Sequence, residues 1–171
     1  MMKKLFCLIL AAALMLSLCC CTERGEAPID PIRYYYRSRD IQYGTDEDVI
    51  AFEIRDRFGH EEDYVYLIND YLKGPQTEKC FSPFPAGTTL VQLDLVKDKV
   101  LVVLSSHISL LEGAELSVAC TCLARTLHEM TGMKLVQISS DGDLMDGEPY
   151  VVIKKDDFAT RDDYSPTAPT S

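Results

Sequence analysis

The 171-residue chain contains no tryptophan and only three histidines, and its 17 lysines and arginines are outnumbered by 27 aspartates and glutamates. Because the net charge is −10, the chain repels phosphate backbones and anionic lipid headgroups. Its nine tyrosines and six phenylalanines are not interleaved with basic residues, as they are in surfaces that stack single-stranded nucleic acid. The composition therefore excludes nucleic acid as a partner.

The sequence also lacks the short motifs that carry common reactions. It has neither a Gly-x-Ser-x-Gly elbow nor a glycine-rich phosphate loop. Ser105, Ser106 and His107 bring hydroxyl groups next to an imidazole at a strand end, but adjacent strand side chains point to opposite faces. We therefore assign no catalytic residue, and we expect a chain that is not an enzyme and needs no cofactor.

Five sulfur- or nitrogen-bearing side chains lie close together in the sequence: Cys120, Cys122, His128, Met130 and Met133. On a helix, the backbones of Cys120 and His128 are about 12 Å apart along the axis. Cys122 points to a different face from Cys120, so these side chains do not converge as metal ligands must. We therefore expect no metal site here.

Residues 141–147 resemble a calcium-binding loop in their alternation of acids and glycines. An EF-hand loop requires an oxygen ligand at position 5 and a glutamate at position 12, where this chain has Met145 and Val152. The segment is better interpreted as a solvated turn.

The N-terminus has the pattern of a secretory signal peptide. Lys3 and Lys4 precede an apolar run over residues 5–18, which is too short to span a bilayer as a helix. The three cysteines that follow resemble the lipobox of bacterial lipoproteins, in which one cysteine is lipidated and becomes the new N-terminus. Cys21 is favoured because the small Cys20 precedes it, whereas the alternative, Cys19, follows the bulky Leu18.

Cysteine usage agrees with a chain outside the cytoplasm that has no disulfide framework. After processing at Cys21, three of the seven cysteines remain unmodified, namely Cys80, Cys120 and Cys122. Cys120 and Cys122 diverge on a helix, so any bridge would have to include Cys80. We expect buried free thiols instead.

Two amphipathic helices are predicted from the spacing of apolar residues. The first pattern starts at His60, with Glu61, Glu62 and Asp63 in the predicted first turn. Over residues 64–72 the apolar positions recur at i, i+3, i+4, i+7 and i+8, and the run is followed by Gly74-Pro75. A second apolar stripe runs from Leu116 to Met130 and ends at Gly132. Ser109 and Glu112 form a capping-box pattern ahead of it, which predicts that this helix begins near Ser109.

Six segments rich in β-branched and aromatic residues predict strands, over residues 32–37, 49–55, 90–96, 99–104, 134–139 and 150–154. The third and fourth are joined through Lys97-Asp98 as a hairpin. The predicted order is β-β-α-β-β-α-β-β. It indicates an α+β fold, a two-layer sandwich in which two helices cover a mostly antiparallel sheet.

Several motifs in this order resemble the GerMN domain of sporulation and spore germination proteins. Leu72-Lys73-Gly74-Pro75 is similar to the family's Leu-x-Gly-Pro signature, and Phe84-Pro85-Ala86-Gly87-Thr88 follows it ahead of a strand. Ala124-Arg125-Thr126-Leu127 resembles part of the Gln-x-x-x-Thr-Leu helix, and residues 136–142 resemble the closing strand and its Asp-Gly turn. Cys122 departs from the pattern because the family often has glutamine there.

The resemblance implies a non-enzymatic module with a ring-building-motif-like fold, attached to the cell envelope of a Gram-positive bacterium. We divide the chain into a signal peptide (1–20), a lipidated tether (21–31), a GerMN-like domain (32–158) and a disordered tail (159–171). The hypothesis is an extracytoplasmic lipoprotein, held at the cell membrane by its lipid, that binds envelope proteins or the cell wall during envelope assembly, sporulation or germination. Its binding residues and any oligomerisation are left open.

Two alternatives belong to other classes of protein. A small extracytoplasmic hydrolase acting on peptidoglycan would show a convergent pair of acids in a deep cleft. A metallochaperone would bind copper through Cys120 or Cys122.

Overall fold

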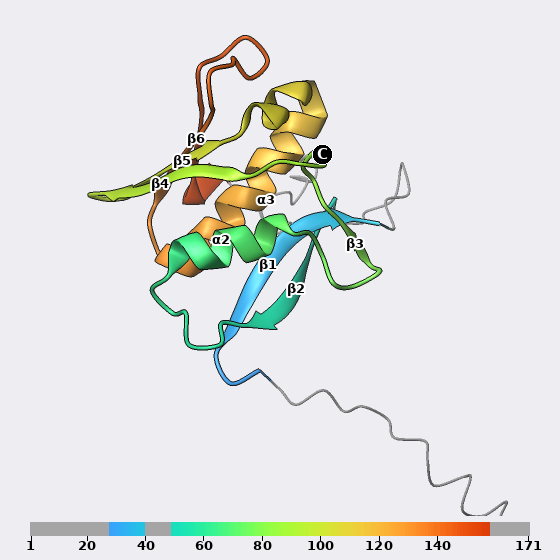
Figure 1. The fold of residues 1–171 in the computed structure, drawn as a ribbon, viewed down its shortest axis with the longest axis vertical. Helices are drawn as coiled ribbons and strands as arrows, with labels where there is room; N and C mark the ends of the chain where they lie inside the picture. Colours follow the sequence, from blue (N-terminus) through green and yellow to red (C-terminus); the bar gives the residue numbers. More distant parts are fainter. Residues whose placement is uncertain (1–27, 40–48, 158–171) are drawn as a thin grey trace, which may run out of the picture.

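All the predicted helices and strands occur in the computed structural model, which describes residues 28–39 and 49–157. Figure 1 shows the path of the chain. Its elements are β1 (Pro31–Ser38), β2 (Ile50–Asp56), α2 (Tyr64–Leu72), β3 (Cys80–Phe81), β4 (Leu90–Val96), β5 (Lys99–Leu104), the 3₁₀ helix η2 (Ser106–Leu110), α3 (Gly113–Thr131), β6 (Leu135–Ser140), β7 (Val151–Lys154) and the 3₁₀ helix η3 (Lys155–Asp157).

The strands divide between two sheets. One is antiparallel and has the order β2-β1-β3, and the other has the order β4-β5-β6-β7, in which only β5 and β6 are parallel. The parallel pair is connected through α3, as parallel neighbours require a crossover. The α+β class and its two helices are confirmed, and the mostly antiparallel strands form two sheets.

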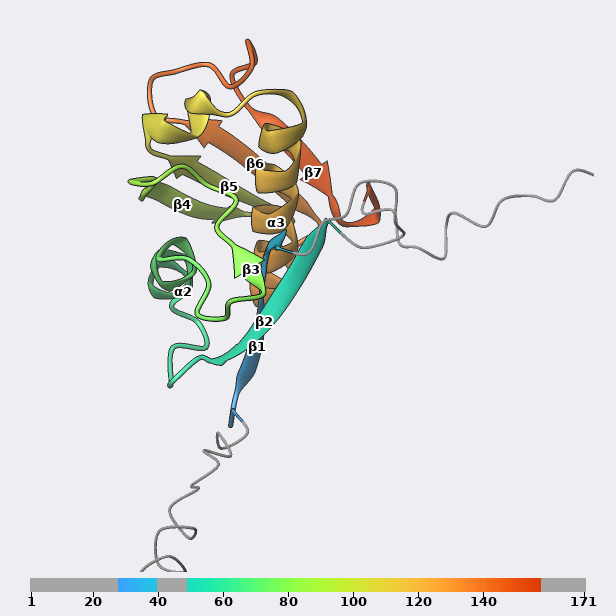
Figure 2. The same ribbon diagram turned by 90° about the vertical axis from the view of Figure 1, so that its right-hand side faces the viewer.

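The division into two sheets has a local cause at the edge of β1. One edge of β1 pairs with β2. On its other edge, only Arg37 and Ser38 pair with a strand, the two-residue β3. Helix α3 packs along the rest of β1, as the side view in Figure 2 shows. Because a helix covers this edge, the four-stranded sheet does not add to it.

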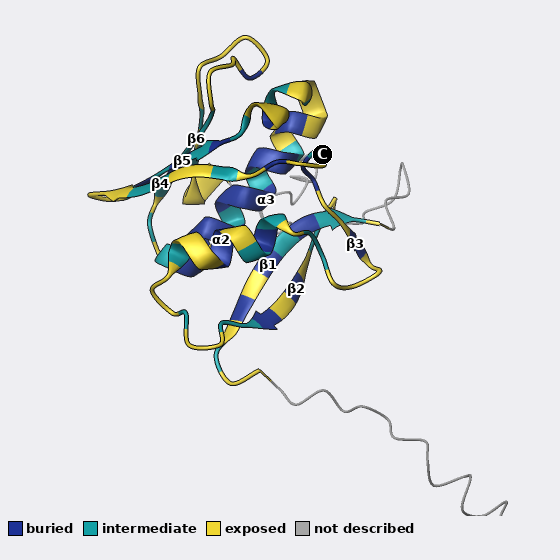
Figure 3. Ribbon diagram, in the orientation of Figure 1, coloured by how far each residue is buried: buried dark blue, intermediate teal, exposed yellow. Residues whose placement is uncertain are grey.

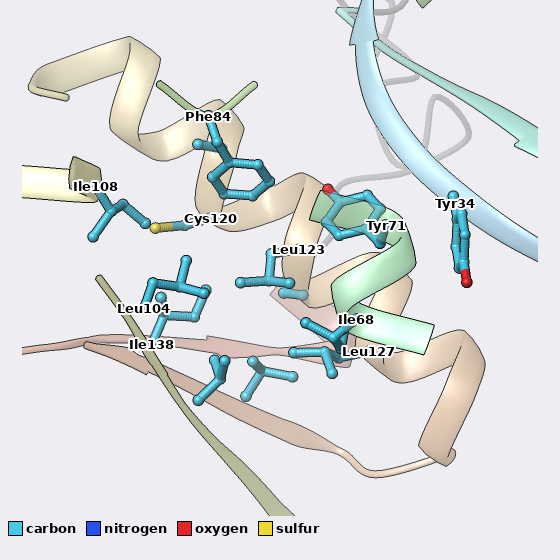
Figure 4. Packing of buried hydrophobic residues seen from close by; sticks show 14 of the residues in the cluster. Tyr34, Ile68, Tyr71, Phe84, Leu104, Ile108, Cys120, Leu123, Leu127 and Ile138 are labelled. Atoms are coloured by element: carbon cyan, nitrogen blue, oxygen red, sulfur yellow. The ribbon is translucent and has the colours of Figure 1, made fainter. Parts of the chain in front are cut away.

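The core lies where both helices meet the inner face of the four-stranded sheet. Figure 3 shows buried residues along α3 and along the side of α2 that faces the interior. In Figure 4, Leu123 and Leu127 of α3 lie with Ile68 and Tyr71 of α2. The apolar stripe predicted for the second helix is therefore its buried face.

Helix α3 begins later than the capping-box pattern predicts. Ser109 lies in η2, where its hydroxyl donates to the hydroxyl of Ser140, 2.8 Å away. Gly113 has a φ of +52°, so the backbone breaks between η2 and α3. The N-cap is Glu112, and its side chain makes no capping hydrogen bond. Gly132 ends the helix in the left-handed conformation, as predicted.

Helix α2 ends ahead of Gly74-Pro75, as predicted, but it begins at Tyr64, so Glu61 and Glu62 lie before the helix and not in its first turn. Its N-cap is Asp63. The Asp63 side chain accepts from the backbone N–H of Tyr66 at 3.0 Å. Lys97, with a φ of +58°, forms the predicted hairpin between β4 and β5. Within the described ranges, none of the helices is long and apolar enough to cross a membrane.

Candidate functional site

Arg55 of β2 is buried, and its guanidinium group is hydrogen-bonded on several sides. Its Nε donates to Oε1 of Glu53 at 2.6 Å, and Nη1 donates to Oδ2 of Asp70 at 2.9 Å. Nη2 donates to the carbonyl oxygen of Gly74 at 2.6 Å. The carbonyl of Gly74, within the motif of residues 72–75, therefore accepts a hydrogen bond from an arginine of the three-stranded sheet.

Glu53 extends this network into the loop after α2. Its Oε2 accepts the backbone N–H groups of Gln76 and Thr77, at 3.0 and 3.1 Å. Glu53 and Arg55 are only 6% and 8% exposed, so each charge is matched by opposite charge or by hydrogen bonds inside the protein. The network fixes the end of α2 and the loop after it to β2, which is a structural role.

Three consecutive tyrosines on β1 join this sheet to α2. The hydroxyls of Tyr34 and Tyr36 donate to the carbonyls of Leu67 and Tyr71 in α2, at 3.1 and 2.9 Å. The ring of Tyr71 stacks on Tyr36, with 4.9 Å between the centroids. Burial raises the pKa of Tyr34, Tyr36 and Tyr71 above the ordinary tyrosine value, so all three stay neutral hydrogen-bond donors.

The peptide group of Tyr35 faces the part of the β1 edge that no strand covers, and side chains satisfy it. Its N–H donates to Oγ1 of Thr126 at 3.0 Å, and its carbonyl accepts the Tyr71 hydroxyl at 2.8 Å. Thr126 and Leu127 are the Thr-Leu pair of the motif identified in the sequence. Thr126 therefore fastens α3 to the edge of β1, and Leu127 is buried in the core.

The three remaining cysteines are buried free thiols, as predicted. Burial raises the pKa of both Cys120 and Cys122 to about 12, so the thiols stay protonated and unreactive at neutral pH. His128 is also buried, and burial lowers its pKa, while its Nδ1 is hydrogen-bonded to the carbonyl of Met133. Within the described ranges, no three His, Cys, Asp or Glu side chains are grouped as a metal would need.

The serines and histidine after β5 lie beside an open cavity of about 530 Å³, which Ser106, His107 and Asp143 help to line. This segment is the 3₁₀ helix η2 and not a strand, so Ser105 and His107 come together: Oγ of Ser105 is 3.3 Å from Nδ1 of His107. Oγ of Ser105 also accepts the N–H of Thr89 at 3.0 Å. The hydroxyl therefore bridges two loop segments, and the hydrogen bonds around it are those of a structural serine.

The outer edge of β2 is open to solvent in the described part of the chain. Ser38 N–H donates to the carbonyl of Val49 at 2.8 Å, so in the alternation of an antiparallel ladder the peptide groups of Phe52 and Ile54 point away from β1. The side chains of Phe52 and Ile54 are 50% and 53% exposed. An open strand edge next to exposed apolar side chains can pair with a further strand.

A second open surface is a groove of about 880 Å³ between the end of β1, the segment after β3 and the start of α3. We call it the arginine groove because Arg37 and Arg39 line it. Its apolar lining includes Phe81, Pro83, Phe84, Pro85, Leu111 and Val118. No binding residue was predicted from the sequence, although Arg37 and Arg39 are two positions apart at the end of a predicted strand in an acidic chain.

Comparison with known proteins identifies the class to which this fold belongs. The family model for sporulation and spore germination proteins, named Germane, matches residues 34–146. The match spans more than half of the chain and contains the Gly74-Pro75 loop, the Thr126-Leu127 helix and every strand except β7 and the start of β1. The chain belongs to the GerMN (Germane) domain family of sporulation and spore germination.

Two solved structures are similar to this chain. The tandem GerMN domains of the sporulation protein GerM from Bacillus subtilis align at a TM-score of 0.51 and 20% identity, over 70% of this chain and 43% of that one. A candidate lipoprotein from Clostridium perfringens, solved at 2.5 Å, aligns at a TM-score of 0.48 and 18% identity, over 75% of this chain and 91% of that one. No curated protein matches. The GerM alignment shows a shared fold.

Proposed function

We propose that this GerMN-family protein is an extracytoplasmic lipoprotein, anchored at Cys21, whose domain binds other envelope components and catalyses no reaction. In this proposal residues 1–20 are the signal peptide and residues 21–31 tether the domain to the cell membrane. Cys21 lies outside the described residues, so support for the anchor comes from the sequence pattern. Acyl chains hold a domain at a membrane because each buried methylene contributes about 0.8 kcal/mol.

The observation that carries the binding role is the open edge of β2. Two peptide groups point outward there, and Phe52 and Ile54 expose about half of their surface. Burial of such a surface by a partner strand combines main-chain hydrogen bonds with apolar contact. A partner in cell or spore envelope assembly, sporulation or germination fits the family to which the chain belongs.

Site-specific photocrosslinking tests the binding role in cells that express the full chain. A photoreactive phenylalanine replaces Phe52 in one strain and Leu144 in a matched control, since Leu144 is also exposed (59%) but lies in the loop before β7. We expect discrete adducts to envelope proteins from position 52 and none from position 144. Equal adducts from both positions, or none from either, would contradict binding through the β2 edge.

Membrane fractionation tests the anchor separately. We expect the unmodified chain in the membrane fraction and the Cys21→Ala variant in the soluble extracytoplasmic fraction. A Cys19→Ala variant is the control, because it leaves the favoured lipid site intact. If Cys19→Ala releases the protein and Cys21→Ala does not, the lipid is attached at Cys19.

A further inference from the structure

The arginine groove contains two cations without a carboxylate partner among the described residues. The guanidinium carbons of Arg37 and Arg39 lie 5.8 and 4.4 Å from the ring centroid of the same residue, Phe81. The Nε of Arg37 is buried and has no hydrogen-bond partner within the described part of the chain. Phe81 thus orients two positive charges side by side, and neither guanidinium forms an ion pair with another described residue.

The opposite part of the lining contributes little positive charge of its own. Ala114 and Glu115, in the first turn of α3, line the groove. The N–H of Gly113 at the start of this helix donates to Oδ2 of Asp146 at 3.2 Å, so a carboxylate already offsets the positive end of the helix dipole. Glu115 is the one acidic residue among the described residues of the lining, and the preference for negative charge therefore comes from Arg37 and Arg39.

The apolar residues of the groove determine what kind of anion fits. Leu111 and Val118 come from the α3 side, and Pro83, Phe84 and Pro85 come from the segment after β3. A free phosphate would leave this apolar surface exposed. A ligand that fills about 880 Å³ needs apolar groups in addition to negative charge.

We infer that the arginine groove binds an extended peptide segment of a partner protein in which acidic and apolar residues alternate. Arg37 lies on β1 and Arg39 directly follows its last residue, where its N–H donates to the carbonyl of Lys79 at 2.9 Å and so continues the pairing beside β3. Two positions apart in extended backbone places their Cα atoms about 6.6 Å from each other. This distance matches the spacing of carboxylates at alternate positions of an extended peptide, whose apolar side chains then point to the opposite side. The inference rests on the proposed binding function and assigns it a ligand chemistry.

Fluorescence anisotropy with the full chain in detergent tests this assignment. The probe is a fluorescein-labelled peptide of sequence Leu-Glu-Leu-Glu-Leu, and the neutral control is Leu-Gln-Leu-Gln-Leu. We expect the acidic peptide to bind at least about 10-fold more tightly, since each carboxylate gains charge-assisted hydrogen bonds. Its affinity should also fall as the salt concentration rises.

The variant pair Arg39→Glu and Arg33→Glu locates the site. Both arginines are exposed and lie over a phenylalanine ring, Phe81 for Arg39 and Phe52 for Arg33, but only Arg39 lines the groove. We expect Arg39→Glu to weaken peptide binding at least about 10-fold and Arg33→Glu to weaken it less than about 2-fold. Arg39→Lys should weaken peptide binding by an intermediate factor, because lysine keeps the positive charge but cannot donate two parallel hydrogen bonds to one carboxylate.

Three outcomes overturn the inference: equal binding of the two peptides, equal losses in the two glutamate variants, or displacement of the peptide by phosphatidylglycerol vesicles or polyphosphate at equal charge. If Arg39→Glu leaves peptide binding intact while crosslinking at position 52 persists, the inference fails and the proposed function stands. If the peptide binds as expected but Cys21→Ala remains in the membrane fraction, anchoring at Cys21 fails and the inference stands.

Discussion

Arg55 lies on β2, and the pair Arg37 and Arg39 lies at the end of the adjacent strand β1 and directly after it, in opposite surroundings. Arg55 is 8% exposed and bonded to two carboxylates and a carbonyl, whereas Arg37 and Arg39 meet an aromatic ring and line an open groove. In each place the guanidinium lies over tyrosine or phenylalanine, so stacking alone does not distinguish them. The difference is whether the polar donors are already satisfied, which separates a structural arginine from one that is available to a ligand.

The largest expected effect comes from removing the structural arginine. We expect Arg55→Met to lower the free energy of unfolding by about 3–5 kcal/mol, because Glu53 would be left buried without its cation. Urea denaturation measures the free energy of unfolding of Arg55→Met and of the surface control Arg33→Met. Arg33 pairs with Glu129 at 3.9 Å on the surface, so its loss should cost no more than about 1 kcal/mol.

The double variant Glu53→Gln with Arg55→Met sharpens the result. If the cost comes from an uncompensated charge, the double variant should be more stable than Arg55→Met alone. A double variant that is less stable than either single variant would contradict this electrostatic explanation.

The second expected effect is a loss of stability at alkaline pH, caused by buried thiols close to Tyr71. Burial raises the pKa of Cys120 and Cys122 to about 12, against about 8.5 in an unfolded chain. Stability is therefore complete below pH 8.5 and is lost as the pH rises toward 12, because only the unfolded state ionises in this interval. Between pH 8 and 9.5 the two thiols should lower the free energy of unfolding by about 2–3 kcal/mol.

Urea denaturation across this pH range measures the effect, and Cys122→Ala provides the matched variant. The slope of stability against pH should fall by about half between pH 8 and 9, where about nine-tenths or more of each unfolded tyrosine, with a pKa of about 10, is still neutral. An unchanged slope would show that other groups cause the alkaline loss.

The third prediction concerns the hydrogen bond that joins α3 to β1. Thr126→Val keeps the shape of the side chain but removes the acceptor for the Tyr35 N–H, which would be left without a partner at the strand edge. We expect a loss of about 2 kcal/mol in the free energy of unfolding. Thr121→Val is the control: its hydroxyl donates to Ser117 on the exposed side of the same helix, so its loss should cost under about 0.5 kcal/mol. Equal costs would rule out the Tyr35 contact as the cause.

The sequence predicted elements well because their signals are local. The spacing from Tyr64 to Leu72 defines α2, and Gly132 defines the end of α3. The start of α3 was predicted wrongly, since Ser109 bonds to Ser140, 31 residues away, and not to its own helix. The separation into two sheets was also not predicted, because it depends on α3 packing along the edge of β1, a contact between segments far apart in the sequence.

The candidate sites were harder to predict, because which face of β2 is buried depends on its partners. The alternation over residues 52–55 places two apolar and two charged side chains on opposite faces, and hydrophobicity alone would turn Phe52 and Ile54 inward. The structure instead buries Glu53 and Arg55, since α2 and its loop supply their hydrogen-bond partners. No local pattern contains that information, so neither the open edge nor the arginine groove could be assigned from sequence.

The smallest difference between a variant and its control is expected at Gly74, whose carbonyl connects the family's signature motif to Arg55. Gly74 has a φ of +97°, and an added Cβ would meet only Ser82, at 3.9 Å, so Gly74→Ala acts through the backbone and not through a clash. Gly142→Ala is the matched control, because Gly142 has a φ of +85° in an exposed turn with open space around it. Each substitution should cost about 1–2 kcal/mol of backbone strain. Gly74→Ala should cost about 1 kcal/mol more in urea denaturation, since relaxation of the strain moves the carbonyl away from Arg55. That excess should disappear in an Arg55→Met background, and if it persists, the glycine is required by the turn alone and not by the arginine.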